Sequence, residues 1–353
     1  MKKKIVVLML GCMLLGIGAC DNKEGISNDP IVITESSSGD VGESQNQTEN
    51  DDQEQTESAN DDQDQVENTN DKQIENGNGG QADGSNASGP NVEELFANGV
   101  VESDFDSDYN AVIMANVHEI ASSSASIQEE LNYVAKFAEQ FDKLVEAAKT
   151  QYELNQSTKW FYVVWDTELN DLWNRICIHA DEQTKESLLS EQRKWVSMKE
   201  EVTGEYIGSQ EDNGSMYPTL QSGFWEKITK NRVYVLANEL AKIKGESFNI
   251  PERDAKYNIC VDDQGTDNVY SSLVTRQSME GKDEAIISLF RTGEIRGTFE
   301  DQGNGKLAFT SDDKKVQGII LLKGWDGASF EVTAVDGSSI VAVGDIYDFD
   351  FAF

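Results

Sequence analysis

The chain has 353 residues, among them 65 acidic and 29 basic side chains, and its formal net charge at pH 7 is −36. This charge repels the phosphates of nucleic acids and of anionic lipid headgroups, so it argues against both as binding partners. A cationic protein is electrostatically easier to accept, although solubility alone explains the same charge. The length allows two domains, but the composition of the first hundred residues removes most of them from that count.

An export signal opens the sequence. Lys2 to Lys4 precede the apolar run Ile5 to Leu15, and a small-residue stretch ends at Cys20. This order predicts a secretory signal peptide over residues 1–20, because the apolar run is much shorter than the roughly 20 residues of a spanning helix. Ile17 to Cys20 resembles the lipobox of bacterial lipoproteins, which implies acylation of Cys20 with fatty acids such as palmitate. We expect an extracytoplasmic protein, lipid-anchored at the cell membrane; the alternative is an ordinary cleaved signal that ends in cysteine.

Residues 21–95 lack the side chains of a folded domain. From Asp21 to Pro90 the chain consists mainly of Asp, Glu, Asn, Gln, Ser and Gly, with no aromatic residue. Roughly 18 acidic residues stand against 2 basic ones in this stretch, so like charges extend it. Such a segment cannot bury enough apolar surface to offset the entropy of ordering. We predict a disordered acidic tether.

Helical periodicity dominates residues 96–247. Apolar residues recur at spacings of three and four, as they do along one face of a helix. The predicted helices are Ile127 to Tyr152, Trp160 to Ile178, Ser187 to Val202 and Trp225 to Lys244. A long connection before the last helix is marked by Gly204, Gly208, Gly214 and Pro218. Together they predict a bundle of four or five helices.

The periodicity changes to two within residues 252–353. Short β-prone runs separated by turn signals are Ala285 to Phe290, Glu294 to Glu300, Lys306 to Thr310, Val316 to Leu322, Ser329 to Val335, Ser339 to Val343 and Tyr347 to Phe353. They predict a small antiparallel β barrel or sandwich. Trp325 falls at a predicted turn, where we expect it to be buried against the barrel end; the alternative is an exposed contact. The fold class is therefore α+β multidomain: an all-α helical bundle, then the β domain, preceded by the tether.

The sequence contains no recognisable catalytic or metal-binding motif. HExxH, GxSxG and Walker-type glycine loops are all absent. His118 and His179 lie in different helical segments without another ligand at metal-binding spacing, so surface or helix-end positions explain them. Cys177 and Cys260 fall in different predicted domains, and both a disulfide and two buried thiols remain open. We expect no enzyme activity, no metal and no cofactor.

Four sequence elements, in order, carry a family resemblance. They are Asp166-x-x-Leu169-Asn170, Gln192-Arg193-x-Trp195, Gly214-Ser215 and Thr229-x-x-Arg232. The series resembles the N-terminal domain of LprI-like lysozyme inhibitors over residues 158–242. Two features depart from the family pattern: its disulfide cysteines are missing, and its Arg-Asp pair after the tryptophan reads Lys199-Glu200.

Most of these positions have a structural interpretation. Trp165, Leu169 and Trp173 are spaced to form one stripe along a helix, and Trp195 can pack against it from the next helix. The polar candidates for ties between helices are Asn170, Gln192, Arg193 and Arg232, with Asp166 or Glu168 as an ion partner.

The resemblance implies a surface-exposed lipoprotein that binds lysozyme-type muramidases and inhibits them, with lysozyme or another cationic envelope protein as its partner. An acidic surface would steer its encounter with a basic enzyme. The motif identifies no residue that enters the enzyme's cleft. The alternative is a non-catalytic envelope adaptor or structural lipoprotein that binds another envelope component.

Overall fold

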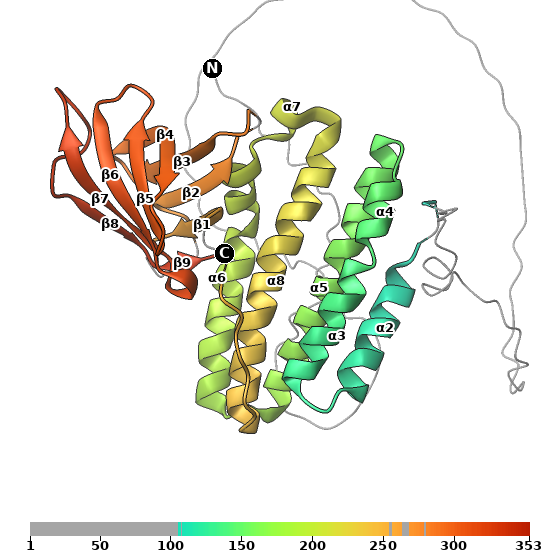
Figure 1. Cartoon of the computed structure of the whole chain (residues 1–353). Coiled ribbons are helices and arrows are strands. Elements are labelled where there is room, and N and C mark those ends of the chain that lie inside the picture. The colour runs from blue at the N-terminus through green and yellow to red at the C-terminus, as the bar shows by residue number, and fades with distance from the viewer. Residues whose placement is uncertain (1–104, 107, 254–255, 263–267, 279) are drawn as a thin grey trace, which may run out of the picture. The chain divides into compact units, whose positions relative to one another are not determined.

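The computed structural model describes residues 105–106, 108–253, 256–262, 268–278 and 280–353, which lie in one compact unit, Ala87–Phe353 (Figure 1). The predicted signal peptide, the expected acylation site Cys20 and the predicted acidic tether lie outside the described residues. None of the helices in the described ranges has the length and apolarity that a membrane span requires.

Helices occupy the first part of the described chain. They are α2 (Asn110–Ser123), α3 (Ile127–Glu139), α4 (Asp142–Ala147), α5 (Gln151–His179), α6 (Glu182–Ile207), α7 (Gln210–Asn213) and α8 (Tyr217–Lys244), with a 3-10 turn η1 (Gly214–Met216) before α8. α5 packs most extensively against α8, and α2 and α3 also pack against α5. The apolar faces that the sequence predicted are buried in this arrangement, which confirms the helical region.

The helix expected from Ile127 to Tyr152 is wrong as a single element. It is divided into α3, α4 and the first turn of α5. α5 begins after Thr150, whose hydroxyl accepts from the backbone N–H of Glu153 while the Glu153 side chain accepts from Thr150 N–H. This reciprocal capping box fixes a helix start where apolar periodicity alone suggested continuity. The connection before α8 is also shorter than expected, because Gly204 lies inside α6.

A nine-stranded antiparallel sheet follows. Its strands are β1 (Asn258–Val261), β2 (Ser272–Gln277), β3 (Asp283–Leu289), β4 (Gly293–Asp301), β5 (Lys306–Ser311), β6 (Val316–Leu322), β7 (Ala328–Val335), β8 (Ile346–Phe349) and β9 (Phe351–Ala352), with a 3-10 turn η2 (Gly324–Asp326) after β6. From β1 to β8 each strand pairs with the next in the chain. β4 and β5 bury alternate residues, as expected for a sheet with one face in the core.

The last strand segment nearly closes the sheet into a barrel. β8 pairs with β7, where Phe349 lies opposite Ala328, and β9 pairs with β1, where Ala352 lies opposite Cys260. Of the predicted alternatives, barrel and sandwich, the barrel therefore describes the fold. Its interior is filled by side chains such as Phe309 and Phe330, whose rings meet edge to face 5.5 Å apart.

The strand expected from Ser339 to Val343 does not form. In this segment side-chain oxygens take the backbone N–H groups that a ladder would need: Ser339 Oγ accepts from Val341 N, and Asp345 Oδ2 accepts from Ala342 N. Val341 is nevertheless buried in the barrel core, so the β-prone composition reflects burial rather than pairing.

Named side chains join the helices to the barrel. The Trp195 ring of α6 stacks on Phe353 with centroids 6.4 Å apart, and Asn231 of α8 donates to the Phe353 backbone oxygen at 3.0 Å. Arg276 of β2 donates from Nη1 to the Tyr206 carbonyl at 2.6 Å. A residue of the family-like Gln-Arg-x-Trp element thus packs on the end of the barrel.

Candidate functional site

The tryptophan stripe predicted on α5 is buried. Trp165 is fully buried, and Leu169 and Trp173 are nearly so. The centroid of the Trp165 ring lies 6.1 Å from that of Tyr234 on α8, and the Nζ atom of Lys230 lies 5.1 Å from the Trp165 centroid. These contacts give the stripe a scaffold role between α5 and α8.

Arg232 joins α8 to α6. Its Nε donates to Gln192 Oε1, and both of its terminal nitrogens lie 3.4 Å from Glu191 Oε2. Gln192 and Arg232 are only 2% and 6% exposed. Burial lowers the pKa of Arg232, and the charge of Glu191 opposes that shift. The polar tie between helices is present, but the ion partner of Arg232 is Glu191 and not the expected Asp166 or Glu168.

The remaining motif residues make local contacts or are exposed. The Tyr162 hydroxyl donates to Asp166 Oδ1 at 2.9 Å, and Asn170 donates to the Asp166 carbonyl one turn earlier on α5. Arg193 is exposed on α6. The Gly214–Ser215 pair is exposed in η1, where Gly214 has a φ of +54° that favours glycine. In the described part of the chain Asn170 and Arg193 therefore show no tie to another helix.

An aromatic enclosure around Lys199 was not predicted. Its Nζ atom lies 4.5 Å from the ring centroid of Trp225 on α8, 4.8 Å from Tyr162 on α5 and 5.3 Å from Trp195 on α6. The same Nζ donates to the Tyr162 hydroxyl at 3.0 Å. Cation–π attraction from three helices therefore converges on one side chain. Only the Trp195–Lys199 spacing of four could have been read from the sequence.

Two buried carboxyl groups, one from α3 and one from α5, share one arginine of α5. Arg175 donates to both carboxylate oxygens of Glu130 and lies 3.7 Å from Glu168 Oε1. Glu168 is fully buried, and desolvation raises its pKa well above the usual value, with a further contribution from the adjacent Glu130. Nearby, His118 of α2 contacts Asp171 of α5 at 2.7 Å. This cluster ties three helices together by ionisable groups.

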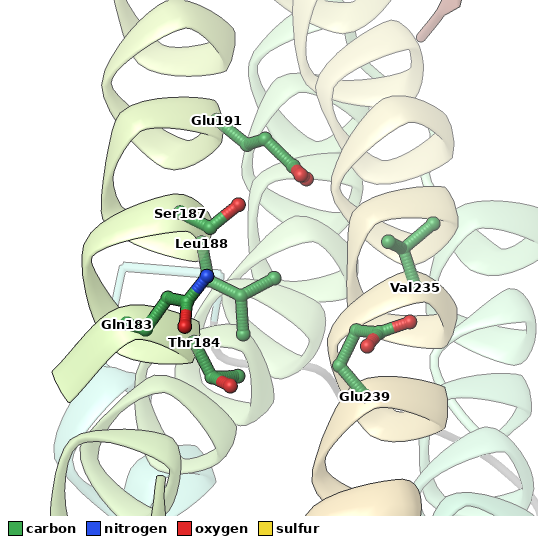
Figure 2. A pocket seen from close by; sticks show the side chains of 7 residues that line it. All are labelled: Gln183, Thr184, Ser187, Leu188, Glu191, Val235 and Glu239. Atoms are coloured by element: carbon green, nitrogen blue, oxygen red, sulfur yellow. The ribbon is translucent and has the colours of Figure 1, made fainter. Parts of the chain in front are cut away.

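A groove of about 540 Å³ lies between α6 and α8 (Figure 2). Its lining residues are Gln183, Thr184, Ser187, Leu188, Glu191, Val235 and Glu239. Glu191 extends into it from α6 and Glu239 from α8, while Leu188 supplies apolar surface. The groove therefore offers carboxylates from both walls; Glu191 is paired with Arg232 and Glu239 with Lys242.

Most of the residues in the stripe, the Arg232 contacts, the Lys199 enclosure and the groove fall within one stretch of the sequence. Residues 145–236 match the family model described as Lysozyme inhibitor LprI. The match, here called the LprI region, begins before and ends before the expected range of 158–242. It contains α5 and α6 and most of α8, including every motif residue from Asp166 to Arg232. No curated protein and no solved structure matches the chain.

The structure brings Gln192 and Arg232 together, and it places Trp195 in the Lys199 enclosure. It leaves the Gly214–Ser215 pair at the surface. The groove was missed because its walls come from helices whose relative register depends on the connection between them.

The described residues contain no group of histidine, cysteine and acidic side chains arranged to hold a metal ion. His179 is exposed at the end of α5. No disulfide joins Cys177 of α5 to Cys260 of β1. Burial raises the pKa of the Cys260 thiol to about 11, so this group is a poor nucleophile at neutral pH.

Proposed function

We propose that this protein binds lysozyme-type muramidases and inhibits them, while a lipid on Cys20 holds it at the outer side of the cell membrane. The observation that carries the proposal is the LprI match over α5, α6 and α8. In this view the buried motif residues form the scaffold, and the exposed surfaces of α6 and α8 make the contact.

Charge supports a cationic partner. A net charge of −36 creates a field that attracts a basic enzyme and speeds its encounter. The α6–α8 groove adds Glu191 and Glu239 at defined positions. Both carboxylates already have an ion partner, Arg232 for Glu191 and Lys242 for Glu239. A lysine or arginine side chain of the partner would enter between them as an additional cation, and Lys242, which is exposed at the end of α8, can turn away from Glu239 to admit it.

A lysis assay tests the proposal. The soluble chain, residues 21–353, should reduce lysozyme-driven clearing of a cell suspension at micromolar concentration, and added salt should weaken the effect. Glu239→Gln should reduce binding several-fold, whereas Glu211→Gln on α7, outside the groove, should not. Unchanged lysozyme activity would refute inhibition, and recovery of only resident envelope proteins in a pull-down would favour the adaptor alternative.

The anchor has its own test. Wild-type protein should fractionate with membranes, and Cys20→Ser should appear in the soluble fraction or retain an uncleaved signal. Equal membrane association of the two forms, with the signal removed from both, would contradict lipid attachment through Cys20.

A further inference from the structure

A second pocket, of about 380 Å³, lies where α8 meets the segment leading into the barrel and η2. It shares no lining residue with the α6–α8 groove. α8 contributes Glu226, Lys230, Asn231 and Tyr234, among others. Arg253 and Trp325 close it from the barrel side. Its volume falls at the lower end of the range for small-molecule sites, about 300–1,000 Å³.

Basic side chains converge on this pocket in an otherwise acidic chain. Lys230 and Arg253 line it together with Lys227, which also donates to the Tyr257 carbonyl. Arg253 is 7% exposed, and its Nη2 donates to Asn258 Oδ1 at 2.9 Å and to the Phe353 backbone oxygen. Its Nε and Nη1 have no partner among the described residues. A buried guanidinium with unused donors favours an incoming anion.

The two acidic residues of the lining, Glu226 and Glu252, do not cancel the preference of the pocket for an anion. Burial raises the pKa of Glu226 to about 7, and Lys230 opposes the shift. The raised pKa favours the protonated form of Glu226 compared with an ordinary glutamate, and a protonated carboxyl group can donate as well as accept a hydrogen bond. The second acidic residue of the lining, Glu252, is exposed to solvent.

Two aromatic rings complete the lining. Trp325 is half-buried in η2, where its Nε1 donates to the Pro251 carbonyl at 3.1 Å and its ring lies 5.4 Å from the Arg253 guanidinium carbon. It packs on the segment between helices and barrel, and η2, which carries it, also contacts β9 of the barrel. Tyr234 lines the pocket from α8. Aromatic surface beside donors and acceptors suits a ligand with one apolar face and several hydroxyl groups.

We propose that this pocket binds a saccharide unit that carries a carboxylate. The Trp325 and Tyr234 rings contact the sugar face, and Asn231 and Glu226 bond its hydroxyl groups. Lys230 and Arg253 attract the carboxylate through charge-assisted hydrogen bonds. This activity is separate from muramidase binding and does not depend on it.

A matched pair of sugars tests the proposal. N-acetylmuramic acid differs from N-acetylglucosamine by an ether-linked group that bears a carboxylate. Titrated against the full-length chain in mild detergent and followed by NMR, the acid should bind at least about tenfold more tightly than the neutral sugar. Equal affinities, or no binding of the acid at millimolar concentration, would overturn the proposal.

Variants separate the roles of charge and ring. Lys230→Gln should weaken binding of the acid about fivefold and leave the neutral sugar unchanged, whereas Trp325→Ala should weaken both. Trp325→Phe, which keeps a ring beside Arg253, should restore most of the affinity. Lys242→Gln, on the exposed end of α8, is the matched control. An unchanged preference for the acid in Lys230→Gln would refute the assignment, and lysozyme inhibition by Trp325→Ala should be normal.

Discussion

Replacing Glu168 by glutamine should change how the stability of the protein depends on pH. Glu168 is fully buried beside Glu130, and its pKa is raised well above the usual value, first by desolvation and then by Glu130. The native protein therefore holds a proton that the unfolded chain releases above about pH 4.3. Glutamine mimics the protonated side chain and has no proton to release.

The sign follows from this difference in bound protons. The contribution of the Glu168 proton to the stability of the folded protein is fully present below about pH 4.3. It is lost as the pH rises toward the pKa of Glu168 in the folded state, by roughly 1.4 kcal/mol per pH unit for one proton. Glu205 and Glu226 have raised pKa values too and contribute the same sign. The difference between wild type and Glu168→Gln isolates Glu168. The free energy of unfolding of the variant should rise relative to that of the wild type as the pH increases, by at most about 3 kcal/mol between pH 5 and pH 7.

Urea unfolding of residues 21–353 at pH 5, 6 and 7, followed by tryptophan fluorescence, measures this difference. Glu186→Gln, at an exposed position on α6, should leave the pH profile unchanged. Arg175→Met should destabilise the protein by about 3–5 kcal/mol, because it leaves the buried Glu130 carboxylate without its partner. Parallel pH profiles for wild type and Glu168→Gln would show that Glu168 is ionised in the folded state and would refute the reasoning.

Three further substitutions test packing and capping by the same unfolding assay. Gly318→Ala should lower the free energy of unfolding by about 1–3 kcal/mol, because its methyl group would lie 2.5 Å from the Glu331 carbonyl oxygen. Gly204→Ala, with nothing within 4 Å, should raise it by about 0.5–1 kcal/mol. Thr150→Ala removes the hydroxyl that accepts from Glu153 N–H and should cost about 1 kcal/mol. A reversed sign at either glycine, or no loss at Thr150, would contradict the described contacts.

The helices were predictable where apolar spacing decides burial. The Trp165, Leu169 and Trp173 stripe is buried as expected, because a spacing of four residues puts these side chains on one face of the helix. The start of α5 also has a sequence signal, since Thr150 and Glu153 form a capping-box pattern, but the apolar period continues across it and predicts one uninterrupted helix. β1 buries four consecutive residues, so no alternation marked it as a strand.

Contacts between distant segments were harder to predict. Gln192 and Arg232 were expected to tie helices together, and they do, but the choice of Glu191 as ion partner depends on how α6 and α8 align. The Lys199 enclosure needs three helices in register. The second pocket needs α8 and η2 together, which residue spacing along the chain does not encode.

Barrel closure has a consequence for the order of folding. Residues 346–353 supply both β8 and β9, so the seam between β7 and β1 cannot form until this segment is available. Partners such as Cys260 and Ala352 are roughly 90 residues apart, and such distant pairing is slow compared with helix formation. The ring that stacks on Trp195 belongs to the same segment. We therefore expect the helices to gain structure early and the LprI region to reach its final rigidity last, when Phe353 docks.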